Sequence, residues 1–147
     1  MIALLQRVSR SSVVVEGREI ARIGKGLNIL LGVLKGDTEA DIDKLVSKIV
    51  HLRIFADEGG RMNRSLIDIA GEVLVVSQFT LAGSVKKGRR PSFDAAMPPE
   101  EAKRLYELFC RNMAAHVPVQ TGEFGAMMEV KIHNDGPVTF IVDSKKL

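Results

Sequence analysis

Two hydroxyl groups and an amide lie together at the end of one apolar run, and these are the side chains best placed to do chemistry. Ser77, Gln78 and Thr80 surround the aromatic residue Phe79, directly after the run Val-Leu-Val-Val at residues 73–76. Hydroxyls and amides hold polar ligands or orient water, and polar groups at a buried strand end need hydrogen-bond partners. The pattern therefore indicates either a strand end that satisfies itself through local bonds or the lip of a binding pocket.

The sequence lacks several common catalytic arrangements that could act with these residues. A threonine hydroxyl needs an adjacent base to act as a nucleophile, and the sequence offers none beside Thr80. His51, His116 and His133 lack the spacing of paired metal ligands, and there is no G-x-S-x-G nucleophile elbow. We therefore expect no metal and no organic cofactor, and an oriented water molecule is favoured over a covalent threonine.

A cationic segment follows this cluster within a short stretch of chain. Four cations occur within five residues and precede Pro91; they are Lys86, Lys87, Arg89 and Arg90. The segment is too short and too broken for a helix, so we expect a surface loop. Such a loop is either a solvated turn or a site for a polyanion, and a polyanion bound there would reach the candidate pocket.

The sequence Asn-Asp-Gly-Pro-Val-Thr at residues 134–139 is the second unusual stretch. Asp-Gly is a strong hairpin signal, and a plain turn with proline starting the next strand would explain it. The pair Gly136-Pro137 also exposes main-chain carbonyls with little side chain beside them, which suits a wall that selects a ligand by shape. Since X-Pro bonds are cis in only about 5–6 % of cases, the sequence does not decide the isomer.

Strands must position most of these residues. Apolar segments separated by glycine turns predict strands at residues 2–8, 12–15, 19–23 and 27–34, joined as antiparallel hairpins. The run at 73–76 predicts a strand buried on both faces. We expect a short strand at 53–55, a last long strand at 126–133 and a hairpin return at 138–142.

Two helices are predicted by period and by their terminal residues. Thr38 begins a capping box, and the first helix repeats apolar residues with helical spacing at Ile42, Leu45, Val46, Ile49 and Val50. The second begins at Pro98-Pro99-Glu100-Glu101, has an apolar stripe that includes Ala102, Leu105, Phe109 and Met113, and ends before Pro118. Cys110 lies in this apolar pattern, so we expect a core residue and not a catalytic thiol.

Length and composition limit the class of protein. With 147 residues and no repeat or linker, residues 1–147 are expected to form one domain of the α+β class. The single cysteine excludes an intrachain disulfide, and no segment approaches the roughly 20 apolar residues of a membrane span. We expect a soluble, cytoplasmic protein without a membrane partner. The formal net charge is only +3, so the position of the cations matters more than their number.

These motifs together resemble the D-aminoacyl-tRNA deacylase family, also described as D-tyrosyl-tRNA(Tyr) deacylases. Residues 77–81 (Ser-Gln-Phe-Thr-Leu) and 134–139 carry the resemblance, with 52–55 and 87–93 between them. The likeness covers essentially the whole chain. It departs from the family pattern at Met127, where many members carry aspartate.

The resemblance implies a fold, an activity and a partner. The fold would be mainly antiparallel strands forming a curled, barrel-like sheet with two helices packed on it, in a homodimer. The protein would hydrolyse the ester of D-aminoacyl-tRNA, and of glycyl-tRNA, at the 3′ end of tRNA, with no role for DNA. Each pocket would be lined by residues 77–81 of one subunit and capped by a cis Gly136-Pro137 turn of the other, whose main chain would exclude L side chains.

Site roles follow by the same resemblance. Ser77, Gln78, Phe79 and Thr80 would form the catalytic segment, with backbone N–H groups around Phe79 and Thr80 stabilising the oxyanion and the ribose 2′-hydroxyl assisting. Phe79 would stack near the terminal adenosine or serve as a core residue. The tRNA phosphates would be bound by Lys86, Lys87, Arg89 and Arg90, and also by Arg7.

Two alternatives remain open at this level. The first is a relative in the same superfamily that removes another mischarged residue, such as an L-amino acid. The second is a non-catalytic RNA-binding module, for which the cationic loop would suffice and the Ser77 to Thr80 cluster would be incidental.

Overall fold

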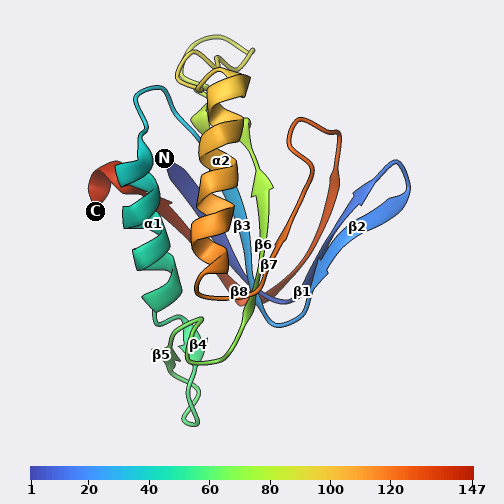
Figure 1. Cartoon of the computed structure of the whole chain (residues 1–147), viewed down its shortest axis with the longest axis vertical. Coiled ribbons are helices and arrows are strands. Elements are labelled where there is room, and N and C mark those ends of the chain that lie inside the picture. Colours follow the sequence, from blue (N-terminus) through green and yellow to red (C-terminus); the bar gives the residue numbers. More distant parts are fainter.

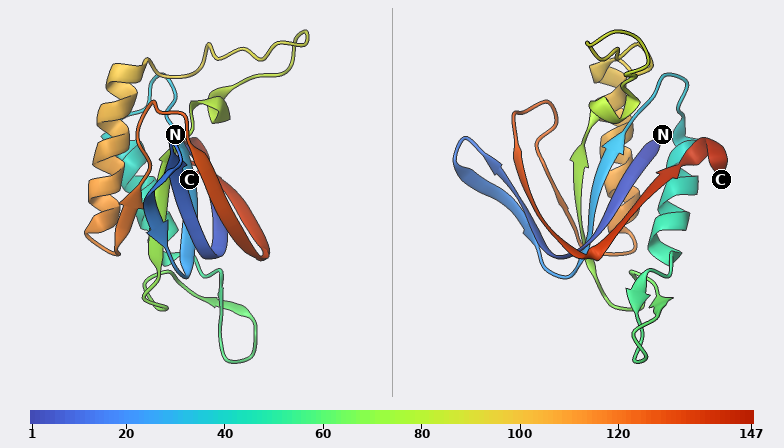
Figure 2. Two further views of the ribbon diagram at one scale, coloured as in Figure 1. Left: turned by 90° about the vertical axis from the view of Figure 1, so that its right-hand side faces the viewer. Right: turned by 180° about the vertical axis from the view of Figure 1, so that it is seen from behind.

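The main sheet is strongly curled, and its two longest strands are β1 (Ile2–Val15) and β8 (Glu129–Asp143). The computed structural model describes residues 1–147, and it shows an α+β fold in which both helices cover one face of a barrel-like sheet (Figures 1 and 2). The remaining strands of the main sheet are β2 (Arg18–Ile23), β3 (Gly26–Gly32), β6 (Glu72–Ser77) and β7 (Val119–Thr121). A separate small sheet pairs β4 (Phe55–Ala56) with β5 (Met62–Arg64).

The sheet combines antiparallel and parallel pairs. Its order is β2-β1-β3-β6-β7, and β8 pairs with β1. The β1–β2, β1–β3 and β1–β8 pairs are antiparallel. The β1–β2 hairpin was predicted from its glycine turn, but the predicted hairpin between 19–23 and 27–34 is wrong, because β1 lies between β2 and β3. The β3–β6 and β6–β7 pairs are parallel, because a helix crosses over between the strands of each pair. The sequence analysis did not predict these two parallel pairs.

Strand β6 is buried on both faces, which confirms the prediction made from its apolar run. Val73 and Val75 belong to the large core between the sheet and the helices. Leu74 and Val76 point the other way, into a smaller core inside the curl of the sheet. Period-two alternation puts successive residues on opposite faces, so a strand with apolar residues at every position must lie between two cores. The polar residue Ser77 ends this strand.

Both predicted helices are present. The helix α1 (Glu39–His51) begins after Thr38, whose backbone N–H donates to the Asp41 carboxylate at 2.8 Å in a capping box. The helix α2 (Pro99–Ala114) begins with proline at its first position. Cys110 is buried in α2, and burial raises the pKa of its thiol to about 12, so it is a core residue as predicted. Neither helix is long and apolar enough to cross a membrane.

The observed strands differ from the predicted ones at several boundaries. The first two predicted strands are one continuous strand, β1, which contains a pair of serines that hydrogen bonding accommodates: the Ser11 hydroxyl donates to Asn28 Oδ1 at 3.0 Å. The last strand begins at Glu129, three residues later than expected, and continues through the predicted turn to Asp143. The short strand lies at Phe55–Ala56 instead of 53–55, and β7 was not predicted.

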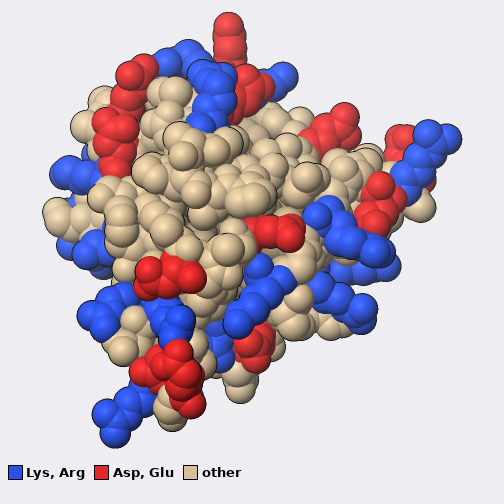
Figure 3. Space-filling view, turned by 60° about the horizontal axis from the view of Figure 1, so that its bottom comes forward, with Lys and Arg blue, Asp and Glu red and all other residues tan.

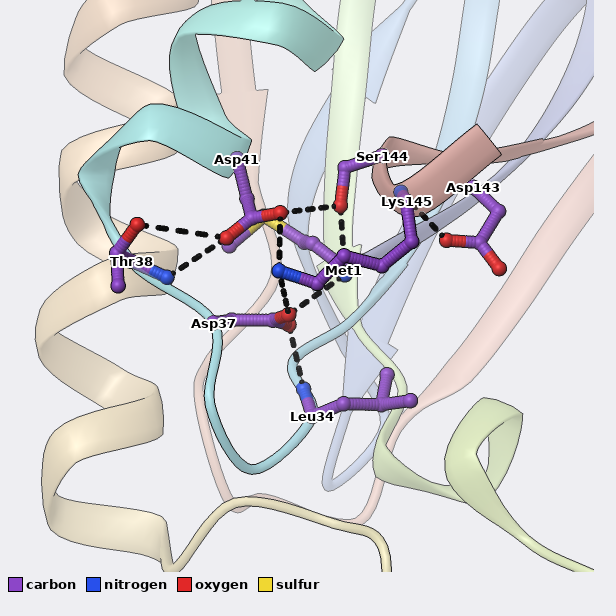
Figure 4. Close-up of polar contacts among 8 residues, drawn as sticks. All are labelled: Met1, Leu34, Asp37, Thr38, Asp41, Asp143, Ser144 and Lys145. Carbon is purple, nitrogen blue, oxygen red and sulfur yellow. Dashed lines mark hydrogen bonds and ion pairs between the residues drawn. The ribbon is translucent and has the colours of Figure 1, made fainter. Parts of the chain in front are cut away.

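A buried polar cluster joins both ends of the described chain to α1 (Figure 4). The amino nitrogen of Met1 donates to Asp37 at 2.8 Å and to the Ser144 hydroxyl at 2.9 Å. The Asp41 carboxylate accepts from Ser144 at 2.7 Å and pairs with Lys145 at 2.8 Å. Burial opposes ionisation of Asp41, but its bonds with Lys145 and Ser144 and the lysine charge outweigh burial, so the pKa of Asp41 is well below its ordinary value.

Candidate active site

A cavity of about 650 Å³ opens where β6 ends, bounded by the start of α2 and by the segment that precedes β8. Two other hollows, of about 980 and 470 Å³, are lined by none of the predicted site residues. The walls of the first cavity are mostly apolar, and its polar lining includes Ser77 and Gln78. The lining residues are Val33, Val76, Ser77, Gln78, Phe79, Phe93, Ala96, Met97, Pro98, Pro99, Ala102, Phe124, Gly125, Ala126, Met127, Met128 and Val130.

Among the polar residues at the end of β6, some bond to one another and some line the cavity, so each of the two interpretations of their sequence holds in part. The Gln78 backbone N–H donates to the Leu31 carbonyl at 2.8 Å, which carries the sheet pairing one residue beyond the strand. The Gln78 side-chain amide donates to the Thr80 hydroxyl, so local bonding does occur. Ser77 and Gln78 nevertheless line the cavity, whereas Thr80 is exposed and is not among the lining residues. The structure therefore brings three of the four predicted catalytic residues to the cavity.

An aromatic pair stands at the mouth of the cavity. Phe79 is 56 % exposed, which excludes the core interpretation of this residue. Its ring meets the ring of Phe93 edge to face, with centroids 5.1 Å apart and an interplanar angle of 65°. Phe93 lies three residues after Arg90, the last cation of the segment. The pair therefore connects that segment to the cavity.

No lining side chain of the cavity is an acid, a base or a thiol. General acid–base catalysis requires a titratable group within about 2.6–3.2 Å of the proton that moves, or one water molecule away. The chain supplies no such side chain in these walls. Proton transfer in this cavity must therefore use water, main-chain groups or the ligand itself.

Main-chain donors are present at the cavity mouth. Residues Phe79–Ala82 form a short 3-10 turn, η1, whose first internal bond runs from the Leu81 N–H to the Gln78 carbonyl at 3.2 Å. The N–H groups of Phe79 and Thr80 come before that bond, and the first N–H groups of such a turn have no partner within it. Gln78 makes no side-chain cap. These two N–H groups therefore have no partner within the turn.

The cationic segment is an exposed loop held at its base. Ser84 and Ser92 pair through two backbone hydrogen bonds of 2.8 Å each, and the loop between them projects beyond the sheet (Figure 2, yellow-green). No ion pair involves any cation of the loop. The exposed, unpaired residues are Lys86, Lys87, Arg89 and Arg90. Their charge is available to an external anion.

The turn at Gly136 and Pro137 lies away from the cavity of its own chain, since neither residue lines it. The Gly136–Pro137 peptide bond is cis. Arg7 supports this turn: its guanidinium donates to the Asp135 carbonyl at 3.2 Å and to the Ile54 carbonyl at 2.9 Å. The Arg7 side chain is only 15 % exposed. Its contacts are those of a structural residue.

Part of the cavity wall was not predicted from the sequence. Phe93, Met97 and the prolines at the start of α2 line the cavity, although the sequence indicated only a loop and a helix start there. Met127, which the resemblance identified as a departure from the family pattern, also lines it and is 92 % exposed. No local signal in the sequence separates these residues from core residues, because both are apolar side chains.

A family model and the relatives in sequence point to one family. The family model described as D-Tyr-tRNA(Tyr) deacylase matches residues 4–143. The D-aminoacyl-tRNA deacylases of Persephonella marina and Nitratiruptor sp. are 67 % and 64 % identical to this chain, each over 100 % of both chains. A solved structure described as c-Myc DNA Unwinding Element Binding Protein is 44 % identical, with a TM-score of 0.92 over 97 % of this chain and 98 % of that one.

Proposed function

Because the chain belongs to the D-Tyr-tRNA(Tyr) deacylase family, we propose that it hydrolyses the ester bond of D-aminoacyl-tRNA and releases the free D-amino acid and tRNA. The observation that carries the proposal is the cavity at the end of β6. It joins apolar walls, suited to an amino-acid side chain, to a polar lip and to a loop of unpaired cations. The proposal treats residues 1–147 as one deacylase domain that acts on the 3′ end of tRNA.

The chemistry needs little from side chains, because an aminoacyl ester is already activated. A water molecule attacks the ester carbonyl, the bond from that carbon to the ribose oxygen breaks, and a proton passes to the ribose oxygen. The N–H groups of Phe79 and Thr80 stabilise the oxyanion, a role in which one donor is typically worth about 2.7–4 kcal/mol. The absence of acids and bases from the cavity walls favours a ribose 2′-hydroxyl as the group that helps move the proton.

The Thr80 side chain has no direct part in this mechanism. Its hydroxyl accepts a bond from Gln78 and lies outside the cavity lining, so we assign it to holding Gln78 in place. Thr80→Val removes the hydroxyl and keeps the size of the side chain. The variant should hydrolyse D-tyrosyl-tRNA at a rate within a few-fold of the wild type, whereas loss of nearly all activity would support a covalent threonine.

Two further contacts would position the tRNA. The exposed ring of Phe79 stacks on the terminal adenosine, an interaction worth roughly 1–3 kcal/mol per base. The cations of the 84–92 loop contact phosphates of the acceptor stem. Arg7, which the resemblance implied as a phosphate ligand, is better explained as a support for the turn, because its guanidinium already bonds two main-chain carbonyls.

Selection between D and L substrates requires a second copy of the chain. The Gly136-Pro137 turn lies outside its own cavity, so we propose that it caps the cavity of a partner in a homodimer. Exposed apolar side chains support such contact: Met127 at the cavity is 92 % exposed and Ile141 on β8 is 72 % exposed. The main chain of the turn would collide with an L side chain, while a D side chain or glycine would avoid it. We therefore include glycyl-tRNA as a substrate.

Mixing two inactive variants tests the shared site. Ser77→Phe fills the cavity, and Gly136→Ala disturbs the turn, since a Cβ there would lie 2.8 Å from the Val138 side chain. Refolding the variants together should restore about a quarter of wild-type activity, because half of the dimers are mixed and each has one intact site of two. Activity no greater than that of the separate variants would contradict a site shared across subunits.

Hydrolysis itself separates the proposal from the other candidate functions. The wild-type protein, at a small fraction of the substrate concentration, should release many equivalents of free D-tyrosine from D-tyrosyl-tRNA. A binding module would retain the charged tRNA and release no amino acid. A relative with another specificity would leave D-tyrosyl-tRNA intact and hydrolyse an L-aminoacyl-tRNA. Either of these two results would overturn the proposal.

A further inference from the structure

Three cations lie side by side on adjacent strands, away from the cavity and the cationic loop. Ser12 on β1 pairs with Arg22 on β2 at one side and with Lys131 on β8 at the other. Directly paired residues point to the same face of a sheet, and neighbouring strands lie about 4.8 Å apart. Arg10 stands two residues before Ser12 and pairs with His133 on β8. The three cations Arg10, Arg22 and Lys131 therefore share one face.

That face is the outer face of the curled sheet. Ala21 on β2 and Val130 on β8, which alternate with Arg22 and Lys131, pack in or against the small core inside the curl. Residues next to them in the strands must point outward. The three cationic side chains are accordingly exposed. Figure 3 shows a group of Lys and Arg side chains on the right-hand side of the molecule, where β1 and β2 lie in Figure 1.

Acidic side chains neutralise only part of this face. Arg10 and Lys131 form no ion pair; the Arg10 guanidinium donates to His133 Nε2 at 3.2 Å. Arg22 pairs with Glu19 at 3.1 Å, and both side chains are well exposed, so this pair contributes little and yields readily to a stronger anion. Glu129 is exposed at the far end of the face, opposite Val14. The net charge of the face remains positive.

We infer that this outer face of β2, β1 and β8, marked by Arg10, Arg22 and Lys131, binds the phosphate backbone of tRNA. The three side chains lie across an open surface and line none of the three cavities described above, which fits an extended polyanion better than a small enclosed anion. The inference rests on the proposed function. The same strand, β8, carries both Lys131 and the Gly136-Pro137 turn. If that turn caps a partner's cavity, β8 connects this face to the site that holds the 3′ end.

Two variants of equal charge test the inference. The sheet-face variant is Arg10→Gln/Arg22→Gln/Lys131→Gln. The control variant removes three exposed, unpaired cations from the outer surfaces of α1 and α2, as Lys44→Gln/Lys48→Gln/Arg111→Gln. Both variants lower the formal net charge from +3 to zero, so a difference between them reports position and not overall charge.

Binding of uncharged tRNA gives a measurement that does not depend on hydrolysis. Its affinity for each protein is measured between about 50 and 200 mM salt, where the log–log slope changes by roughly 0.7–0.9 per phosphate contact. We expect the slope of the sheet-face variant to be shallower than that of the wild type by about 2, and the slope of the control variant to be unchanged. Equal slopes for wild type and sheet-face variant, or equal changes in both variants, would overturn the inference.

A substrate that lacks the tRNA phosphates separates this inference from the proposed function. Hydrolysis of D-tyrosyl-adenosine, which lacks the phosphates of the tRNA, should be the same for the wild type and for the sheet-face variant. If the wild type binds tRNA through this face but hydrolyses neither substrate, the proposed function fails and the inference about binding stands.

Discussion

Replacing Phe93 tests whether the ring of Phe79 is held at the cavity mouth by its aromatic neighbour. Phe93→Ala removes the edge-to-face contact, in which the ring centroids are 5.1 Å apart. The 84–92 loop keeps its cations and its paired base at Ser84 and Ser92. The expected defect therefore concerns the reacting end of the substrate and not the binding of phosphates.

The size of the defect follows from the contact. Phe79 is 56 % and Phe93 39 % exposed, so neither ring is fully buried, and the effect on Phe79 is worked from the ring–ring contact. An aromatic pair is worth about 0.5–1.5 kcal/mol beyond its buried area. If all of this energy serves to position Phe79, kcat/KM falls between about 2-fold and 13-fold. Thermal stability should change little, because the pair lies at the surface.

The assay compares D-tyrosyl-tRNA with D-tyrosyl-adenosine. Phe93→Ala should impair hydrolysis of both substrates, and Phe93→Tyr, which keeps the ring, should restore both rates. Phe93 also lines the cavity, so the double variant with Phe79→Ala is needed. If Phe93 acts through Phe79, the double variant is no slower than Phe79→Ala alone. Additive losses, or wild-type rates for Phe93→Ala, would refute the reasoning.

Two predictions concern the fold that holds the site. Gly26→Ala should destabilise the protein by about 3 kcal/mol or more in urea unfolding, since its Cβ would lie 1.8 Å from the Glu72 carbonyl oxygen. Gly24→Ala is the control, because its Cβ would meet no atom nearer than 3.9 Å. An equal loss of stability in both variants would contradict this explanation. The pKa of Asp41 is lower in the folded protein than in the unfolded chain, where it is about 3.9. The ionised carboxylate therefore stabilises the fold when the pH is above about 3.9, and this contribution is lost as the pH falls below that value. Asp41→Asn should therefore lower the free energy of unfolding by about 1–3 kcal/mol at pH 7, and by progressively less below about pH 4. A loss of stability that does not change with pH would show that the ion pair with Lys145 is unimportant.

Most elements of this fold follow from local sequence, but the parallel pairs of the sheet do not. The run at 73–76 and the helical periods of α1 and α2 predict their elements because side-chain period and burial are coupled within a few residues. The parallel pairing of β6 with β3 and β7 depends on crossovers through whole helices. The curl depends on β1 pairing with β3 on one side and β8 on the other, at opposite ends of the chain.

The site residues that could be predicted from the sequence are polar residues that interrupt an apolar pattern. Ser77 and Gln78 were identified because polar residues end an apolar strand, and both line the cavity. Phe93 and Met97 were not identified, because an apolar side chain that lines a cavity has the same sequence pattern as one that fills a core. Gly136 lies outside the cavity of its own chain, and no periodicity in the sequence predicts that position.

Hydrolysis of one tRNA charged in three ways tests the central claim most directly. The purified protein is incubated at catalytic concentration with D-tyrosyl-tRNA, L-tyrosyl-tRNA and glycyl-tRNA, and the acid-precipitable charged fraction is followed with time. The account predicts rapid loss of the D-tyrosyl and glycyl esters, with the L-tyrosyl ester spared. Equal loss of all three esters would contradict selection by exclusion, and loss of none would contradict the deacylase function itself.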